Sequence, residues 1–349
     1  MAEVDVIRTL MHTTDTIRLL SKGSLHKVYH ASLLYGSYQL SRLFRKNLHA
    51  GLPIAASFEP TTHCNLRCPE CPSGLRSFTR DTGSADLSAY QNLIDELAPH
   101  LWYLILYFQG EPFLHPHFLD LVRYAHSKKI YTATSTNAHY ITPEKAREII
   151  DSGLDRLIIS IDGTDQKTYE NYRVGGSLEK VIEGTKNILE ARKKDRSKGP
   201  HIVFQFLVVK PNEHQIPEVK KLAKELGVDD VWLKTAQIYD YQNGSPLIPD
   251  QEKYSRYKKD NNGTYSIKYS KEKGCWKMWH SCVFTWDKKV VPCCFDKDAH
   301  HVMGDQNEIG FKKIWKGAPY RKFRDTLMKS RSQVEMCKNC SEGVKVFSS

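Results

Sequence analysis

The sequence predicts an α/β fold whose parallel sheet forms a partial (β/α)6 TIM-like barrel. Between residues 54 and 234, apolar segments of strand length alternate with amphipathic segments of helix length. This alternation is typical of a parallel sheet, and six strand–helix repeats favour an open barrel over a closed one. Gly153 and Gly227 follow two of the helical segments, as residues that end helices often do.

The repeats define the expected elements in chain order. We expect strands at Ile54–Phe58, Tyr103–Phe108, Ile130–Ser135, Arg156–Ile161, Ile202–Val209 and Asp230–Lys234. The helices predicted between them cover Leu87–Leu97, His117–Ser127, Pro143–Ser152, Leu178–Arg192 and Ile216–Leu226. Together these segments form the predicted core domain, residues 51–240.

The first fifty residues are predicted to be a helical extension, residues 1–50. Apolar residues follow three- and four-residue steps there, at Leu25, Val28, Tyr29, Leu33, Leu40, Leu43 and Phe44. Arg42, Arg45 and Lys46 place positive charge beside them. Two interpretations stay open: a helix packed on the core domain, which we favour, or a weak contact of residues 1–50 with a membrane surface.

The C-terminal part, residues 241–349, is predicted to be a small cysteine-rich domain. Residues 236–274 are polar and contain the turn-forming segments Asn243–Pro246 and Asn261–Gly263, which we interpret as a connector. Six of the nine cysteines follow it.

Composition narrows the class of protein. The 349 residues, of which 40% are hydrophobic, support a sizeable core. No apolar run reaches the length of about 18 residues that a membrane-spanning helix needs, and the N-terminus lacks the pattern of a signal peptide. Clustered cysteines favour metal ligands in a reducing compartment, so we expect a cytoplasmic protein.

The net charge of +11 admits nucleic acid or an anionic surface as a partner. The basic residues are spread along helical segments, and no RNA-binding signature is present. We therefore expect no nucleic-acid partner.

Cys64, Cys68 and Cys71 form the most informative motif, with the spacing Cys-x-x-x-Cys-x-x-Cys. A loop this short can direct all three sulfurs to one point. Three thiolates can hold three irons of a 4Fe–4S cluster and leave the remaining iron open for chemistry. Zinc is the main alternative, but it prefers a fourth ligand, and His63 is poorly placed to supply it.

Further unusual residues follow the next predicted strands. Gln109, Gly110 and Glu111 follow the second strand, Thr136 and Asn137 the third, and Asp162-Gly163 the fourth, with Arg173 in the helical region beyond. Ligand sites of parallel α/β proteins form at the carboxyl ends of the strands. The common position of these motifs therefore favours one shared site.

At these residues the chain resembles the radical S-adenosylmethionine (radical SAM) superfamily. The cysteine spacing matches its cluster signature, and Gln109–Pro112 is similar to its Gly-Gly-Glu motif. The segment Ser160–Gly163, followed by Tyr169–Arg173 and Gly175–Ser177, resembles the branch that carries a SPASM or twitch extension. The resemblance implies a 4Fe–4S cluster, SAM as cofactor, and a one-electron donor such as flavodoxin or ferredoxin.

The resemblance also implies roles for individual residues. Cys64, Cys68 and Cys71 would ligate the SAM-binding cluster. Glu111 would hold the SAM amine, and Gly110, next to Gln109, would allow close approach of the backbone. The remaining expected SAM contacts are Ser135, Thr136, Asn137, Ser160 and Arg173.

The later cysteines suggest a second metal site. Cys337-x-x-Cys340 is a knuckle, and Cys293 ends a predicted hairpin with its turn at Asp287–Lys289. With Cys275, this region resembles a shortened SPASM domain, which implies one auxiliary 4Fe–4S cluster held by Cys275, Cys293, Cys337 and Cys340. Zinc remains an alternative there, and we interpret Cys282 and Cys294 as buried thiols outside the site.

The functional prediction is a radical SAM oxidoreductase or maturase that acts on a peptide or small metabolite. It would cleave SAM reductively and abstract a substrate hydrogen, and the auxiliary cluster would transfer electrons or place the substrate. The alternative from another class is a non-catalytic zinc-binding regulator or RNA-binding protein.

Overall fold

A computed structural model describes residues 13–268 and 273–343 of the 349-residue chain. The described residues form two compact units, each assembled from segments that are separate in sequence. The first comprises residues 13–63, 78–133 and 273–343, and the second comprises residues 64–77 and 134–268. Strand β3 (Tyr131–Thr136) crosses from the first unit to the second.

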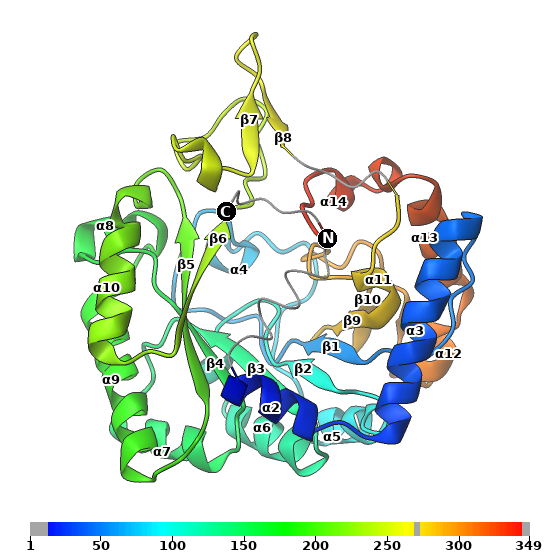
Figure 1. The fold of residues 1–349 in the computed structure, drawn as a ribbon, viewed down its shortest axis with the longest axis horizontal. Coiled ribbons are helices and arrows are strands. Elements are labelled where there is room, and N and C mark those ends of the chain that lie inside the picture. Colours follow the sequence, from blue (N-terminus) through cyan, green and yellow to red (C-terminus); the bar gives the residue numbers. More distant parts are fainter. Residues whose placement is uncertain (1–12, 269–272, 344–349) are drawn as a thin grey trace. The chain divides into compact units, whose positions relative to one another are not determined.

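The first unit is built on strands in the order β11-β10-β9-β1-β2-β3 (Figure 1). β1 (Ala55–Phe58) pairs in parallel with β2 (Tyr103–Ile105) on one side and with β9 (Ser281–Phe284) on the other. β10 (Lys289–Val291) and β11 (Gly304–Asp305) continue the sheet with antiparallel pairs. The predicted hairpin after residue 281 is therefore present, and it also covers the edge that β1 would otherwise expose.

The helices of the first unit come from three parts of the chain. They are α2 (Thr13–Ser21), α3 (Leu25–Phe44), α5 (Leu87–Leu97), α6 (Phe118–Ser127), α11 (Lys277–His280), α12 (Phe311–Trp315), α13 (Ala318–Lys329) and α14 (Glu335–Lys338), with 3-10 turns η1 (Pro112–Leu114) and η4 (Arg331–Gln333). In α5, the Asp86 side chain caps the helix by accepting the Ala89 N–H at 2.8 Å. Its apolar residues at helical spacing are buried, as the sequence pattern predicts.

The second unit contains the parallel strands β4 (Arg156–Ser160), β5 (His201–Val208) and β6 (Asp230–Thr235). Its helices are α4 (Pro72–Leu75), α7 (Pro143–Asp151), α8 (Gln166–Tyr172), α9 (Leu178–Lys194) and α10 (Ile216–Leu226), with the 3-10 turn η2 (Glu213–Gln215). Gly227 ends α10 in the left-handed conformation, at φ +83°, as its position in the sequence predicts.

All of the predicted parallel strands are present, with ends shifted by a few residues. The largest shift is in β2, which ends at Ile105 instead of Phe108. The Leu106 N–H still donates to Ala133 O at 2.7 Å, and the chain then leaves the sheet toward Gly110, whose φ is +76°. The predicted α/β class with a parallel sheet is confirmed.

Residues 236–268 differ from the predicted connector. They contain the 3-10 turn η3 (Glu252–Tyr254) and a hairpin of β7 (Tyr257–Lys259) and β8 (Tyr265–Ile267). Tyr257 is buried, its hydroxyl accepts the Ile238 N–H at 2.9 Å, and its ring stacks on Tyr241 at 4.6 Å between centroids. Tyr257 therefore fixes the hairpin to its own unit. The polar composition of the segment gives no indication of this buried tyrosine.

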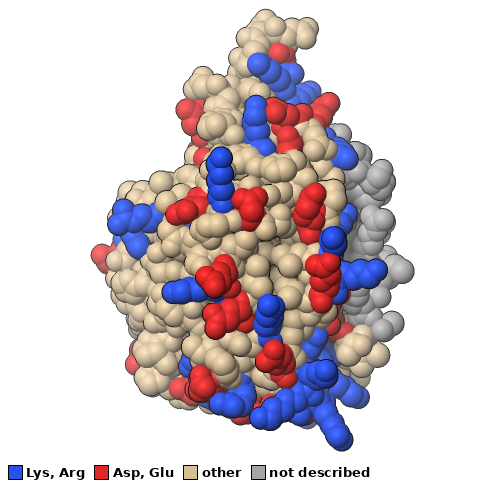
Figure 2. Space-filling model, turned by 90° about the vertical axis from the view of Figure 1, so that its left-hand side faces the viewer, with Lys and Arg blue, Asp and Glu red and all other residues tan. Residues whose placement is uncertain are grey.

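On the face that Figure 2 shows, basic and acidic side chains are interspersed. In the described part of the chain, no helix combines the length and the apolar character that crossing a membrane requires.

Candidate functional site

The three-cysteine loop begins the second unit and leads directly into α4. Cys71 is the N-cap of α4; its N–H donates to Cys68 O at 3.3 Å, and its own carbonyl accepts the Leu75 N–H at 2.8 Å. The Leu66 N–H donates to Cys64 Sγ at 3.5 Å. These contacts curl the chain so that the three thiols are carried on one short turn.

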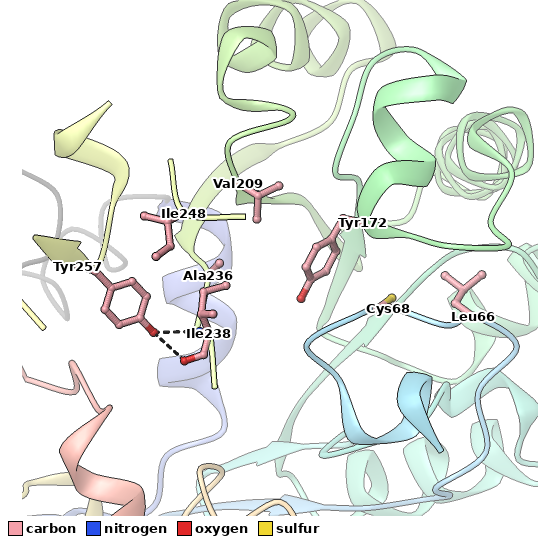
Figure 3. Packing of buried hydrophobic residues seen from close by; sticks show 8 residues of the cluster. All are labelled: Leu66, Cys68, Tyr172, Val209, Ala236, Ile238, Ile248 and Tyr257. Carbon is pink, nitrogen blue, oxygen red and sulfur yellow. Dashed lines mark hydrogen bonds between the residues drawn. The ribbon is translucent and has the colours of Figure 1, made fainter. Parts of the chain in front are cut away.

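The loop is packed against buried side chains from the rest of the second unit (Figure 3). Leu66 and Cys68 are buried beside Tyr172, and Cys64 and Cys71 are partly buried around them. The wider apolar cluster also contains Val209, Ala236, Ile238, Ile248 and Tyr257. The thiols therefore lie at the edge of a core, where a bound group would be partly shielded from water.

Arg173 brings a positive charge to this loop. Its Nε donates to Asp162 Oδ2 at 2.5 Å, and its Nη1 lies 3.9 Å from Cys68 Sγ. The Asp162 carboxylate is fully buried and also accepts the Leu207 N–H at 2.7 Å. Burial raises the pKa of Asp162, and Arg173 opposes this rise. The ion pair thus fixes the guanidinium beside the cysteine loop.

The same balance applies to the Cys68 thiol. Burial raises the pKa of Cys68, whereas Arg173 lowers it and Cys71 raises it. A thiol in this environment ionises readily only when a cationic partner is present. The donor set therefore suits a positively charged metal group, as the cysteine spacing predicts.

Among the predicted strand-end residues of the second unit, Asn137 contacts the same loop. The Asn137 Nδ2 donates to Oδ1 of Asn65, the residue after Cys64, at 2.8 Å. The Ser135 and Ser160 hydroxyls lie 3.5 Å apart at the ends of β3 and β4. Thr136 is buried, and its hydroxyl accepts the Ala138 N–H at 3.0 Å.

The Gln109–Glu111 segment lies in the first unit and is tied to the residues just before the cysteine loop. The Glu111 N–H donates to His63 O at 2.7 Å. A Cβ at Gly110 would lie 2.3 Å from Thr61 O, so only glycine fits. Both Gln109 and Glu111 are buried, and Glu111 Oε1 also accepts the Phe113 N–H at 3.2 Å.

Sequence reasoning missed Gly74, which the structure places against the cysteine loop. A Cβ on Gly74 would lie 2.5 Å from Cys68 N and 2.6 Å from Cys68 O. Asn65 was also missed, although it bonds Asn137. Neither residue carries a signal in the spacing pattern, because their importance arises from contacts within the folded loop.

Replacing Gly74 by alanine is expected to displace Cys68 and lower the iron content of the reconstituted protein. Backbone atoms cannot yield to the added methyl group without a shift of the loop, and overpacking of this kind costs about 1–3 kcal/mol. The measurement is iron per chain after anaerobic reconstitution, with circular dichroism as a check on folding. Gly36→Ala is the matched control, since nothing lies within 4 Å of its added Cβ. Equal iron content in both variants would contradict the prediction.

The second predicted site lies in the first unit, where Cys275, Cys293, Cys337 and Cys340 line one cavity. Its other lining residues are Lys277, Met278, Phe295, Phe323, Leu327, Arg331, Met336 and Glu342. Among the described residues, no three His, Cys, Asp or Glu side chains converge as ligands of a single metal ion. The four thiols instead surround a cavity with apolar walls.

The chemistry of this donor set fits a cationic group. Burial raises the pKa of Cys337 to about 12 and of Cys340 to about 11, and it also raises the pKa of Cys275 and Cys293. Arg331 faces the thiols, and its buried Nε has no acceptor among the described residues. That N–H is positioned to donate to a thiolate or sulfide in the cavity.

Cys282 and Cys294 lie outside this lining. Cys282 is buried in β9, opposite Ala56 of β1. Cys294 packs against Val283 and Val291, and its Sγ accepts a hydrogen bond from Lys277 Nζ at 3.2 Å. Lys277 also lies 3.9 Å from Glu342, and both side chains line the cavity, so Lys277 contacts Cys294 from the cavity side.

Comparison with known protein families agrees with this arrangement. The family model of the radical SAM superfamily matches residues 58–228, which contain the cysteine loop and the strand-end residues. The SPASM model, an iron–sulfur cluster-binding domain, matches residues 275–341, which contain the four cavity cysteines.

Individual relatives extend the comparison. The chain is 26% identical to a tungsten-containing aldehyde ferredoxin oxidoreductase cofactor-modifying protein from Pyrococcus furiosus, across 76% of this chain and 82% of the relative. It is 28% identical to a PqqA peptide cyclase from Rhodopseudomonas palustris, across 57% of this chain and 52% of the relative.

The fold is also shared with a solved structure, that of Streptococcus suis SuiB bound to S-adenosylmethionine. The TM-score is 0.63 at 15% identity, and the match covers 84% of this chain and 73% of the other. The matches to the two family models set aside the alternative of a non-catalytic zinc-binding or RNA-binding protein. The chain belongs to the radical SAM superfamily, in the branch with a SPASM domain, and is an enzyme that uses SAM, a SAM-binding 4Fe–4S cluster and an auxiliary cluster.

Proposed function

We propose that this enzyme cleaves SAM at a cluster held by Cys64, Cys68 and Cys71 and abstracts a hydrogen atom from a peptide or small metabolite. The observation that carries the proposal is the cysteine loop, whose thiols lie beside Arg173 and whose Asn65 bonds Asn137. When bound, the reduced cluster would supply one electron for cleavage of SAM to methionine and a 5′-deoxyadenosyl radical that would take the substrate hydrogen.

The chain's own residues would bind and orient SAM. The buried Glu111 carboxylate would accept hydrogen bonds from the SAM amine, and Gln109 and Gly110 would shape the adjoining backbone. Arg173, fixed by Asp162, would face the SAM carboxylate or ribose. Ser135, Thr136, Asn137 and Ser160 would contribute the remaining polar contacts. Packing of Leu66 and Tyr172 around the loop would limit water at the reacting atoms.

Cys275, Cys293, Cys337 and Cys340 would ligate the auxiliary cluster. Four thiolates leave no iron open, so the proposed role is electron transfer or substrate placement. The proposed division is a helical extension at residues 1–50, a catalytic core at 51–240 and an auxiliary domain at 241–349, although the described residues 241–268 pack with the core strands of the second unit. The clustered thiols favour a reducing compartment such as the cytoplasm, with flavodoxin or ferredoxin as the electron donor.

Two classes of substrate are supported by the names of relatives. One relative modifies a cofactor and another cyclises a peptide. The chain covers 82% of the first relative but 52% of the second. A small metabolite or a peptide is therefore the proposed substrate.

The test is SAM cleavage by the anaerobically reconstituted protein. With a chemical reductant or reduced flavodoxin, we expect methionine and 5′-deoxyadenosine in equal amounts. Deuterium transfer from labelled peptides or metabolites into 5′-deoxyadenosine then identifies the substrate. A protein with full iron content that binds SAM and cannot cleave it under any reductant would overturn the proposal.

Replacing Glu111 by glutamine is expected to weaken SAM binding while leaving iron content unchanged. The glutamine carbonyl can still accept the Phe113 N–H, but the charge opposite the SAM amine is lost. Loss of such a charge-assisted contact costs about 1.5–3 kcal/mol, which is roughly a 10- to 150-fold loss of affinity. The measurement is the SAM dissociation constant at equal iron loading.

The matched control for this substitution is Glu213→Gln. Glu213 also accepts backbone N–H groups, from Asp250 at 3.2 Å and Gln251 at 2.9 Å, but it belongs to no predicted site. The same SAM affinity in both variants and in wild type would refute the role of Glu111.

A further inference from the structure

The N-terminal helix α3 faces the first unit with its more polar side. Its buried residues are Lys27, His30, Leu34, Ser37, Tyr38 and Ser41. Lys27 Nζ donates to Lys129 O at 2.7 Å, and His30 Nδ1 accepts the Leu52 N–H at 3.1 Å. The Ser41 hydroxyl accepts the Leu48 N–H at 2.9 Å. These directed bonds fix which side of the helix points inward.

Tyr38 adds an aromatic anchor on the same side. Its ring lies 5.3 Å from each of the rings of Trp276 and Trp279, between centroids. α3 also contacts α11, which contains Trp279 (Figure 1). The orientation of α3 is therefore set by packing as well as by hydrogen bonds.

The outer side of the helices carries large apolar side chains, among them most of those that define the apolar pattern in the sequence. Leu25 is 91% exposed, Leu43 73% and Phe44 58%. At 3.6 residues per turn, Leu25, Tyr29, Leu40 and Leu43 fall within about 60° of one another. Among the described residues, ten of the sixteen exposed large apolar side chains lie between residues 17 and 48. We use the name α2–α3 apolar face for these exposed apolar residues taken together: Ile17, Leu20, Leu25, Val28, Tyr29, Tyr35, Leu40, Leu43, Phe44 and Leu48.

Within the stretch of chain that carries this face, the exposed charge is basic. No Asp or Glu occurs from Thr16 to Phe58, and Asp15 at the start of α2 is buried. Arg18, Lys22, Arg42, Arg45 and Lys46 lie in this stretch outside the inward side of α3, on which Lys27 is buried. Arg42, Arg45 and Lys46 are exposed at the C-terminal end of α3, next to Leu43 and Phe44. A protein surface that carries both acidic and basic side chains would favour charges of both signs on this face. An anionic lipid surface attracts basic side chains at every position.

We propose that the α2–α3 apolar face docks this protein onto an anionic membrane surface. The helices would lie in the plane of the interface, with Leu25, Leu43 and Phe44 inserted among the acyl chains. Tyr29 and Tyr35 would sit at headgroup level, and the basic side chains would pair with lipid phosphates. This inference is independent of the proposed catalytic function.

The test is vesicle flotation with the anaerobically reconstituted full chain. Wild type is expected to bind vesicles of phosphatidylcholine with about one third phosphatidylglycerol, and to bind pure phosphatidylcholine at least about tenfold more weakly. The variant Leu25→Ser/Leu43→Ser/Phe44→Ser should lose binding by about tenfold or more, since it removes the inserted side chains. Arg42→Gln/Arg45→Gln/Lys46→Gln should lose only the advantage of anionic vesicles.

The matched control is Val302→Ser/Ile309→Ser, which removes two exposed apolar side chains of the same unit outside the face. It should bind vesicles like wild type, and all variants should keep wild-type SAM cleavage. Failure of wild type to bind anionic vesicles would overturn the proposal, as would equal binding by the apolar triple variant. Light scattering tests whether the face binds a second copy of the chain instead. If wild type is a dimer, the apolar triple variant is a monomer and neither binds vesicles, the face is a dimer interface and the membrane proposal is wrong.

Discussion

Replacing Cys68 by alanine is expected to abolish reductive SAM cleavage. The variant keeps two of the three thiolates on the loop, and two cannot hold a cluster with one open iron in a defined position. Cys68 is also the buried member of the set, next to Arg173 Nη1, so its loss leaves the guanidinium beside an empty space. We expect 5′-deoxyadenosine formation to fall to background, and the same result for Cys64→Ala and Cys71→Ala.

The measurement is 5′-deoxyadenosine per chain after identical anaerobic reconstitution. Cys282→Ala is the matched control, because Cys282 is also buried but lies in β9, outside both predicted ligand sets. It should retain iron and SAM cleavage. Wild-type rates of 5′-deoxyadenosine formation by Cys68→Ala would disprove the assignment of the SAM-binding cluster.

The sequence could predict this loop because ligand spacing is a local property. Cys64, Cys68 and Cys71 lie within one short turn, so their convergence requires no knowledge of distant contacts. The position of the polar motifs after successive strands is also a local property, and the proposal that they share one site rests on the alignment of the carboxyl ends of parallel strands. Gly74 and Asn65 were not, because their roles depend on how the loop folds back on itself.

Helices and strands with a strong periodic pattern were predictable from the sequence. The pairing between strands that are far apart in the chain was not. The hairpin of β9 and β10 was predicted, but its parallel pairing with β1, more than two hundred residues earlier, leaves no local trace. Helix α3 shows a different limit. Periodicity identifies an apolar side but cannot tell which side packs inward when Lys27, His30 and Ser41 make the decisive bonds.

Replacing both Cys337 and Cys340 by alanine is expected to remove the auxiliary cluster and about half of the iron. The two residues come from one Cys-x-x-Cys knuckle at α14, so the cavity would keep only Cys275 and Cys293. Two thiols on separate segments are too few ligands to keep a 4Fe–4S cluster bound. Arg331 would also lose two of the thiols that raise its pKa against the opposing effect of burial. α14 is expected to loosen, because metal binding contributes folding energy in small modules.

The functional consequence should be selective. SAM cleavage without substrate should persist, since Cys64, Cys68 and Cys71 belong to the other unit, whereas turnover of the true substrate should fall. Iron content and uncoupled 5′-deoxyadenosine formation are measured together with zinc content. The complementary variant, with all three loop cysteines replaced by alanine, should retain the other half of the iron. If that variant is folded and contains zinc but no iron after reconstitution, the four C-terminal cysteines form a structural zinc site, and the electron-transfer role is wrong.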